Sequence, residues 1–270
     1  MGPTLLIGYD VESKDPKVLE DFLLKASRIH EELDAPCTLF VLGRSLEMAP
    51  EIFVRVAAGS GIFDIQQHTY SHLPLKSVVI ESEEGVMMFC RGGSLDEIRE
   101  EVGKTKALIS ELLGLECIGL TGPNGYYRGL MDRPDILEVL HELGIRFTRT
   151  YARNEKDWQP VPFEVQPFFY EPQGFPDMME FPVQGWQDCI WRGIHGWEKV
   201  DLYLEMLFEN LEFVASRGLT WCYCGHDWSS IKEDPDMRIM REFIRRAKEM
   251  GFRLTSYRNY FEEASRSRDR

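Results

Sequence analysis

The sequence lacks any long hydrophobic run. No apolar segment approaches the roughly 20 residues that a membrane-spanning helix needs. The N-terminus has no basic start, and the apolar run at residues 5–9 is too short for a signal peptide. The sequence therefore predicts a cytoplasmic protein that does not enter the membrane.

Basic residues are also in short supply. Lys and Arg number 31 against 45 Asp and Glu, which gives a formal net charge of -14. Such a charge repels nucleic acid phosphates and anionic membranes, and no basic block offsets it. We expect no nucleic acid partner and no polyanionic substrate, although the local charge of a cleft can differ from the total.

The cysteines show neither disulfide-scaffold nor zinc-knuckle spacing. There are six of them, and most fall in strand-like apolar runs. This distribution is typical of small buried side chains in a reducing compartment.

Short apolar runs alternate with amphipathic segments along the chain, and this alternation predicts the fold. With 43% hydrophobic and 28% charged residues, the 270 residues are sufficient for a large folded core. Strands are expected at residues 4–9, 37–42, 62–66, 117–120, 146–150, 181–183, 219–224 and 252–255. Helices are expected to begin near Asp15, Pro50, Ser94 and Pro134, and to cover residues 199–217 and 235–250. The helix from Pro50 is expected to stop at Gly59 or Gly61, and Ser94 with Glu97 is expected to form a capping box for a helix that ends at Gly114.

This order of elements favours a parallel sheet, either open or closed into a barrel. No linker or internal repeat divides the chain, so residues 1–270 are expected to form one domain. Residues 77–93 and 153–179 break the rhythm and are expected to be long loops, which often serve as lids or as substrate walls.

Two histidines, His68 and His72, stand four residues apart directly after an apolar run. On one helical turn they would project the same way and could bind a single metal ion. Asp10 and Glu12 follow another apolar run, and two histidines with one carboxylate form a recurrent open site for a divalent metal. Chance or core packing is the alternative for a lone pair of this spacing.

Further polar residues follow strand-like runs, namely Thr121 to Asn124 and His226. In parallel α/β folds, ligand chemistry gathers at the carboxyl ends of the strands. These clusters, together with Asp10 and His68, are therefore expected to converge on one edge of the sheet.

These residues resemble the polysaccharide deacetylase family, the chitooligosaccharide deacetylase homology domain of carbohydrate esterase family four. The segments that carry the resemblance extend over nearly the whole chain: residues 36–43, 50–72 with the His-Thr-x-x-His centre, 97–126, 179–183 and 225–226. The resemblance implies an α/β fold, a single-domain distorted (β/α) barrel of about seven parallel strands. It also implies a metal-dependent hydrolase of N-acyl groups on sugars.

Carried over by position, the resemblance makes His68 and His72 metal ligands, Asp10 the general base and His226 the general acid. Many members have two adjacent aspartates where this chain has Asp10-Val11-Glu12, so Glu12 is the candidate third ligand. Direct binding of the metal by Asp10, with Glu12 solvated, is the rival arrangement. Zinc is the default metal for two histidines and a carboxylate.

A second departure concerns an arginine that usually orients the catalytic aspartate. At the corresponding position this chain has Thr121. Arg128 could substitute from the following loop, although a solvated Arg128 is the simpler alternative. The candidate substrate-binding residues are Asn124, Tyr126, Arg128 and Trp228, of which the two aromatic residues could stack on a ring.

The leading prediction is a metal-dependent hydrolase of a non-peptide carbon–nitrogen bond, a deacetylase of an N-acyl sugar or related small amide. One alternative is a catalytically weakened member that binds a carbohydrate or small ligand, as the missing arginine and altered carboxylate motif suggest. Another is a relative that opens cyclic amides or ureides. The predicted partner is a small-molecule or oligosaccharide substrate, and the sequence leaves open whether the chain forms a homo-oligomer.

Overall fold

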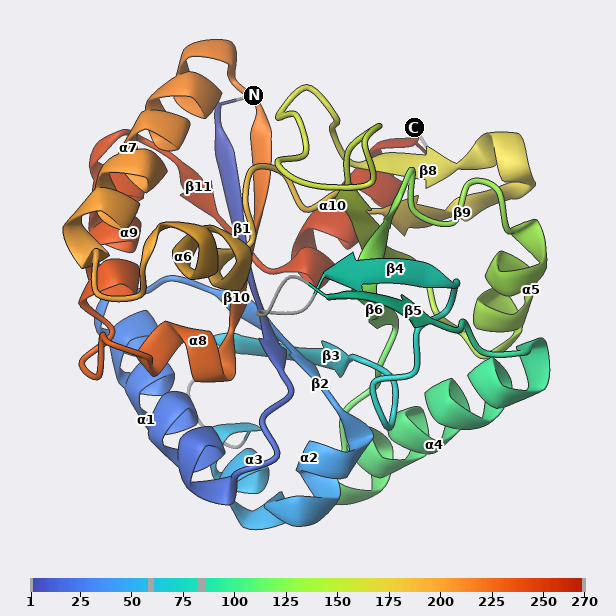
Figure 1. Cartoon of the computed structure of the whole chain (residues 1–270). Helices are drawn as coiled ribbons and strands as arrows, with labels where there is room; N and C mark the ends of the chain where they lie inside the picture. Colours follow the sequence, from blue (N-terminus) through green and yellow to red (C-terminus); the bar gives the residue numbers. More distant parts are fainter. Residues whose placement is uncertain (1, 58–60, 82–85, 269–270) are drawn as a thin grey trace.

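The computed structural model describes residues 2–57, 61–81 and 86–268. Its main feature is a largely parallel sheet surrounded by helices (Figure 1). The strands of this sheet are β1 (Thr4–Val11), β2 (Cys37–Val41), β3 (Phe63–Gln67), β6 (Gly119–Tyr127), β7 (Phe147–Arg153), β8 (Phe168–Tyr170), β9 (Phe175–Glu180), β10 (Thr220–His226) and β11 (Arg253–Leu254). The helices are α1 (Pro16–Glu32), α2 (Gly43–Met48), α3 (Pro50–Ala57), α4 (Leu95–Leu113), α5 (Pro134–Glu142), α6 (Asp188–His195), α7 (Val200–Arg217), α8 (Asp227–Ile231), α9 (Arg238–Glu249) and α10 (Tyr257–Arg268).

The strand order is β10-β1-β2-β3-β6-β7-β9-β8, and β11 pairs with the start of β1. Every neighbouring pair is parallel except β8 with β9. The predicted α/β fold with a parallel sheet is confirmed. Within the described residues, strand pairing does not close the sheet into a barrel. The side chain of Gln184, which follows β9, reaches across to β10. Its amide nitrogen donates to the carbonyl of Thr220, and its oxygen accepts from the Cys222 backbone amide at 2.7 Å.

Local sequence signals account for several element boundaries. Asp15 caps α1, and Pro16 occupies the first helical turn, where its missing amide proton costs nothing. Ser94 and Glu97 form the predicted capping box of α4, and Gly114 ends that helix in the left-handed conformation. Helix α3 is described as far as Ala57, and of its two expected ends, Gly59 and Gly61, the first lies outside the described residues.

The two segments expected to be loops contain strands. Residues 77–93 include the hairpin of β4 (Val78–Glu81) and β5 (Met87–Cys90), which crosses in front of β6 in Figure 1. Residues 153–179 include β8, the short 3-10 helix η1 (Glu171–Gln173) and most of β9. The strand expected at residues 181–183 is wrong, because β9 ends at Glu180. Periodicity missed the hairpin because its outward side chains are also apolar: Phe89 is 71% exposed.

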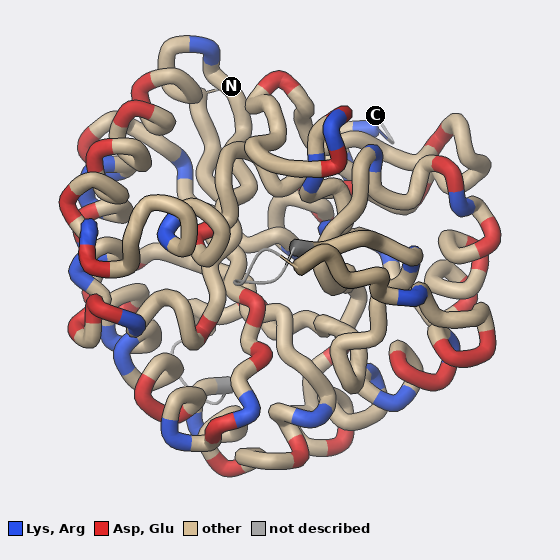
Figure 2. Tube along the Cα trace, in the orientation of Figure 1, with Lys and Arg blue, Asp and Glu red and all other residues tan. Residues whose placement is uncertain are grey.

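Charged residues of both signs alternate along the outer helices, as the colours of the trace in Figure 2 show. The apolar core lies between those helices and the sheet, where β1 and β2 are buried along their whole lengths. Within the described residues, no helix is long and apolar enough to cross a membrane. Because charges of both signs alternate along the outer helices, we look for the functional site at the carboxyl ends of the parallel strands.

Candidate active site

A cavity of about 210 Å³ lies at the carboxyl ends of the parallel strands. Its lining includes Asp10 and Glu12 from the end of β1, the His68 and His72 pair after β3, and His226 at the end of β10. In the parallel pairing of β1 with β10, Asp10 lies opposite His226. The structure thus brings together all five side chains predicted for catalysis and metal binding.

The two histidines reach one another without a helix, which corrects the premise that they share a helical turn. Thr69 and His72 have positive φ values of 60° and 69°, so the chain between them is irregular. Glu101 of α4 holds this segment by accepting from the backbone amides of Tyr70 and Ser71 at 2.9 and 2.7 Å. The two imidazole rings end with their centroids 4.8 Å apart.

Glu12 lies between the two imidazoles. Its Oε2 is 3.2 Å from His68 Nε2 and 3.0 Å from His72 Nε2. Burial opposes ionisation of this carboxyl, but its hydrogen bonds to His68 and His72 outweigh burial and hold the pKa of Glu12 well below its usual range. Trp228 Nε1 donates to the other carboxylate oxygen at 3.0 Å and fixes the orientation of Glu12.

The donor atoms of these three residues fit a divalent metal. Ligands held at about 2.0 Å by one tetrahedral zinc ion lie roughly 3.3 Å apart, close to the two separations above. His68 Nδ1 lies 3.0 Å from the carbonyl of Thr121, which favours the tautomer that leaves Nε2 free for a metal. Asp10 Oδ2 lies farther away, 4.0 Å from His68 Nε2.

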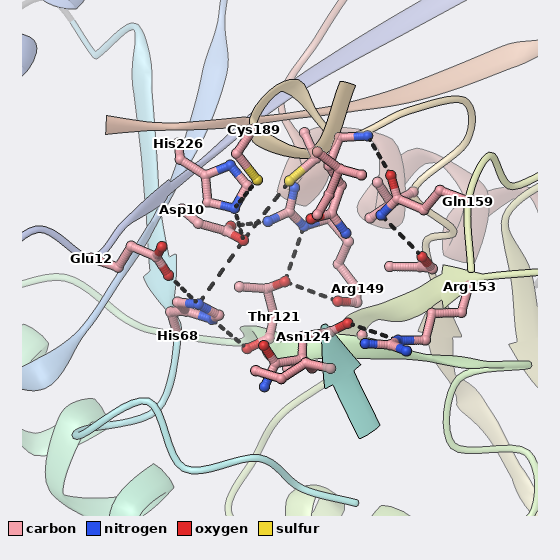
Figure 3. A pocket seen from close by; sticks show the side chains of 18 of the residues that line it. Asp10, Glu12, His68, Thr121, Asn124, Arg149, Arg153, Gln159, Cys189 and His226 are labelled. Carbon is pink, nitrogen blue, oxygen red and sulfur yellow. Dashed lines mark hydrogen bonds and ion pairs between the residues drawn. The ribbon is translucent and has the colours of Figure 1, made fainter. Parts of the chain in front are cut away.

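Asp10 has an arginine partner, but the arginine comes from a different strand than the family pattern suggests. Thr121 on β6 pairs in register with Arg149 on the neighbouring β7. Arg149 Nη2 forms an ion pair with Asp10 Oδ1, and its Nε donates to Thr121 Oγ1 at 3.1 Å (Figure 3). Although burial opposes the charged form, Asp10 raises the pKa of Arg149 above its ordinary value.

His226 is held by a second carboxylate. Asp188, the first residue of α6, lies 2.6 Å from His226 Nδ1 and also accepts from the His226 backbone amide at 3.0 Å. Burial opposes the imidazolium, yet neighbouring Cys189 and Asp188 raise the pKa of His226 well above 6.5. Burial raises the pKa of the Cys189 thiol, which is therefore neutral at neutral pH, so the Asp188 carboxylate supplies the charge.

The opposite ring nitrogen of His226 faces the cavity. Its Nε2 lies 3.9 Å from Asp10 Oδ2 and 3.9 Å from Cys189 Sγ. A base and a protonated acid therefore face the same space, an arrangement suited to removing one proton and delivering another.

The predicted substrate-binding residues divide into two groups. Asn124 and Trp228 line the cavity. Tyr126 and Arg128 do not: Tyr126 is 2% exposed and packs in a core cluster, where its hydroxyl accepts from the Leu75 amide, and Arg128 is exposed. Both miss the cavity because Asn124, Gly125 and Arg128 have positive φ values, which redirect the end of β6.

Sequence reasoning missed Arg149 and Asp188. A charged residue in the middle of the expected strand at residues 146–150 was an available signal for Arg149. Asp188 gave no signal, because α6 was not expected and because Asp188 lies 38 residues from His226 along the chain.

Comparison with known proteins gives two findings. A model of the polysaccharide deacetylase family matches residues 7–148, which is 142 of 270 residues. A comparison with curated proteins found no match.

Solved structures with a similar fold cover most of this chain. A Mycobacterium smegmatis protein classed as a polysaccharide deacetylase shares 17% identity, covering 99% of this chain and 92% of its own, with a TM-score of 0.68. The PuuE allantoinase shares 13% identity, covering 96% and 88%, with a TM-score of 0.65. A pseudoenzyme of the same esterase family from Bacillus anthracis shares 13% identity, covering 96% and 65%, with a TM-score of 0.58. At these identities the likeness concerns the fold.

Proposed function

This chain belongs to the polysaccharide deacetylase family, and from that premise we propose that it is a metal-dependent hydrolase of a carbon–nitrogen bond other than a peptide bond. Its proposed substrate is an N-acyl sugar or a related small amide. The observation that carries the proposal is the convergence of a paired base, a paired acid and a three-residue metal-ligand set on one cavity.

Glu12, His68 and His72 are the proposed ligands of a divalent metal, for which zinc is the default. When bound, such an ion polarises a carbonyl and lowers the pKa of a coordinated water. The distances favour Glu12 over Asp10 as the carboxylate ligand. The Oε2 atom of Glu12 lies 3.2 Å from the Nε2 atom of His68 and 3.0 Å from that of His72, whereas the Oδ2 atom of Asp10 lies 4.0 Å from the Nε2 atom of His68. The choice of zinc and the cytoplasmic location stay predictions.

The remaining roles follow from the partners of each side chain. Asp10 accepts the proton of the attacking water, and the guanidinium of Arg149 holds its carboxylate in position. His226 donates a proton from Nε2 to the departing nitrogen, while Asp188 holds Nδ1 protonated and fixes the ring. The positive charge of Arg149 also offsets part of the negative charge that Asp10 and Glu12 bring to the cavity.

The size of the cavity favours a small substrate. Its volume of about 210 Å³ is below the roughly 300 Å³ at which pockets for drug-sized ligands begin. Ile80 of β4, Trp158 of the loop after β7 and Ile190 of α6 all line it. This confinement keeps the alternative of a cyclic amide or ureide, since such rings are compact.

The binding-only alternative loses its main support. It rested on the replacement of the family arginine by Thr121 and on the altered carboxylate motif. Arg149 supplies a guanidinium to Asp10 from the adjacent strand, which removes the first of these two supports. A weakened catalyst would still bind metal, so activity rather than metal content separates these alternatives.

The test is a metal-supplemented screen of N-acetyl sugars, N-formyl sugars, cyclic imides and ureides, with Asp10→Asn as the inactive control. Elemental analysis should give about one metal equivalent per chain, and His68→Ala should abolish it. Equal activity of the metal-free protein would refute the metal-dependent mechanism. Metal binding without turnover of any amide would instead support the binding-only alternative.

A further inference from the structure

Strand β7 brings two arginines to the same cavity. Arg149 and Arg153 are four residues apart, and the period of two along a strand places both on one face. Both line the cavity and both are largely buried, at 1% and 7% exposure (Figure 3). Arg149 has a role in the proposed mechanism, whereas Arg153 has none, although it is also a buried cation that lines the cavity.

The two guanidiniums differ in their partners. Arg149 has a buried carboxylate, Asp10, as its counter-ion. Arg153 instead contacts neutral carbonyls: its Nε donates to Asn124, and its Nη1 donates to Val79 at 3.1 Å and to Asp157 at 3.0 Å. A guanidinium has five N–H donors, and these three contacts leave the two on Nη2 without a partner in the described part of the chain.

The charge of Arg153 is also poorly compensated. The carboxylate of Asp157 lies 3.4 Å from Nη1, but its side chain is 56% exposed, and water weakens an ion pair of that kind. Burial lowers the pKa of Arg153 despite this neighbour, whereas the pKa of Arg149 is raised. A buried cation whose partners are mainly neutral carbonyls is costly unless a ligand brings an opposite charge.

We propose that Arg153 is the anion-recognition residue of this cavity, and that the substrate is a small amide that carries a carboxylate group besides the bond to be cleaved. The free Nη2 donates to a carboxylate oxygen, forming a charge-assisted hydrogen bond. The assignment of the ligand as a substrate rests on the proposed hydrolase function, whereas anion binding by Arg153 does not.

A purely structural role is the competing explanation. Arg153 connects the end of β6, the β4–β5 hairpin and the loop after β7 through the three carbonyls named above. Its removal could loosen the cavity wall without any effect specific to charge. The test must therefore compare two ligands of the same size that differ only in charge.

N-Acetylglycine and N-acetylglycinamide form such a pair, and their binding to the full chain can be measured by ligand-observed NMR and calorimetry. The metal-free protein is used first, because a bound metal would itself attract the carboxylate. We expect the wild type to prefer the carboxylate by about tenfold or more. Arg153→Gln should abolish this preference, and Arg153→Lys should retain part of it.

Asp157→Asn is the matched control, because it removes the exposed partner and leaves Arg153 in place. It should preserve or increase the preference for the carboxylate. Equal binding of the two ligands by the wild type, or no binding of either at millimolar concentration, would overturn the proposal. Equal weakening of both ligands in Arg153→Gln would show a structural role instead.

The zinc-loaded protein then separates the two proposals. If acidic amides are cleaved, Arg153→Gln should raise KM for the carboxylated member of a substrate pair far more than for the neutral member. A retained carboxylate preference in binding, with no turnover of any amide, would refute the hydrolase and leave anion recognition by Arg153 in place.

Discussion

Replacing Arg149 with methionine should both destabilise the protein and impair catalysis. Methionine keeps an unbranched apolar stem beside the ring of Phe40, over which the guanidinium lies at 4.4 Å. The change removes the ion pair with Asp10 and the hydrogen bond from Nε to Thr121 Oγ1. Asp10, at 7% exposure, is then left as a buried carboxylate without its cationic partner.

Breaking a buried ion pair by removing one partner costs about 3–5 kcal/mol. Both side chains of this pair are at most 10% exposed, so solvent screening does not reduce that range. For a chain of this size, 1 kcal/mol corresponds to roughly 2–4 °C, so the melting temperature should fall by on the order of 10 °C. Loss of the orientation of Asp10 should lower kcat/KM by about a hundredfold or more.

Thermal unfolding followed by circular dichroism and steady-state kinetics on the substrate found by screening measure the two effects. A double variant, Thr121→Arg with Arg149→Thr, returns the arginine to the adjacent strand at the paired register position. It should recover part of the activity lost in Arg149→Met. If Arg149→Met stays within about 1 kcal/mol of the wild type and fully active, the assigned role of this ion pair is wrong.

Two further changes test other parts of the site, and a third tests a buried carboxylate outside the cavity lining. Burial lowers the pKa of His226, and the negative charge of Asp188 raises it; Asp188→Asn removes that charge. The His226 imidazolium should then lose its proton at a lower pH. The alkaline limb of the kcat/KM profile should therefore move to lower pH. An unmoved limb would exclude His226 as the acid. Glu12→Gln should weaken metal affinity at least about tenfold in a chelator competition, while an unchanged affinity would favour Asp10 as the ligand. Glu180→Gln should lower the free energy of unfolding, measured by urea titration, by about 2–4 kcal/mol. An amide cannot accept all the hydrogen bonds that Thr148, Thr150 and Tyr151 donate to the buried carboxylate. A change below about 1 kcal/mol would contradict this account.

Local signals in the sequence carried most of the fold prediction. Strand β1 was expected at residues 4–9 and is observed at Thr4–Val11, and α4 begins and ends at its predicted caps. Such elements are predictable because capping and apolar periodicity depend on residues within a few positions of each other. The β4–β5 hairpin and β9 were missed because their apolar residues do not follow a simple alternation of buried and exposed positions.

Site residues could be predicted from the sequence only where a histidine or a carboxylate follows directly after an apolar run. Asp10, Glu12, His68, His72 and His226 were all named from the sequence, and all five line the cavity. Their spacing was interpreted partly for the wrong reason, since a loop and not a helical turn brings His68 to His72.

The sequence by itself supplied the proposed metal donors and acid–base groups, because these are properties of side chains, and it supplied the alternation of strands and helices that predicts a parallel sheet. Tertiary structure decided which charges meet. Arg149 reaches Asp10 across 139 positions of the chain, and Asp188 reaches His226 across 38. Those contacts depend on strand register and on where α6 packs, and neither follows from the residues next to them. The same register places Arg153 in the cavity, so the carboxylate proposed for the substrate also follows from the folded chain and not from the local sequence.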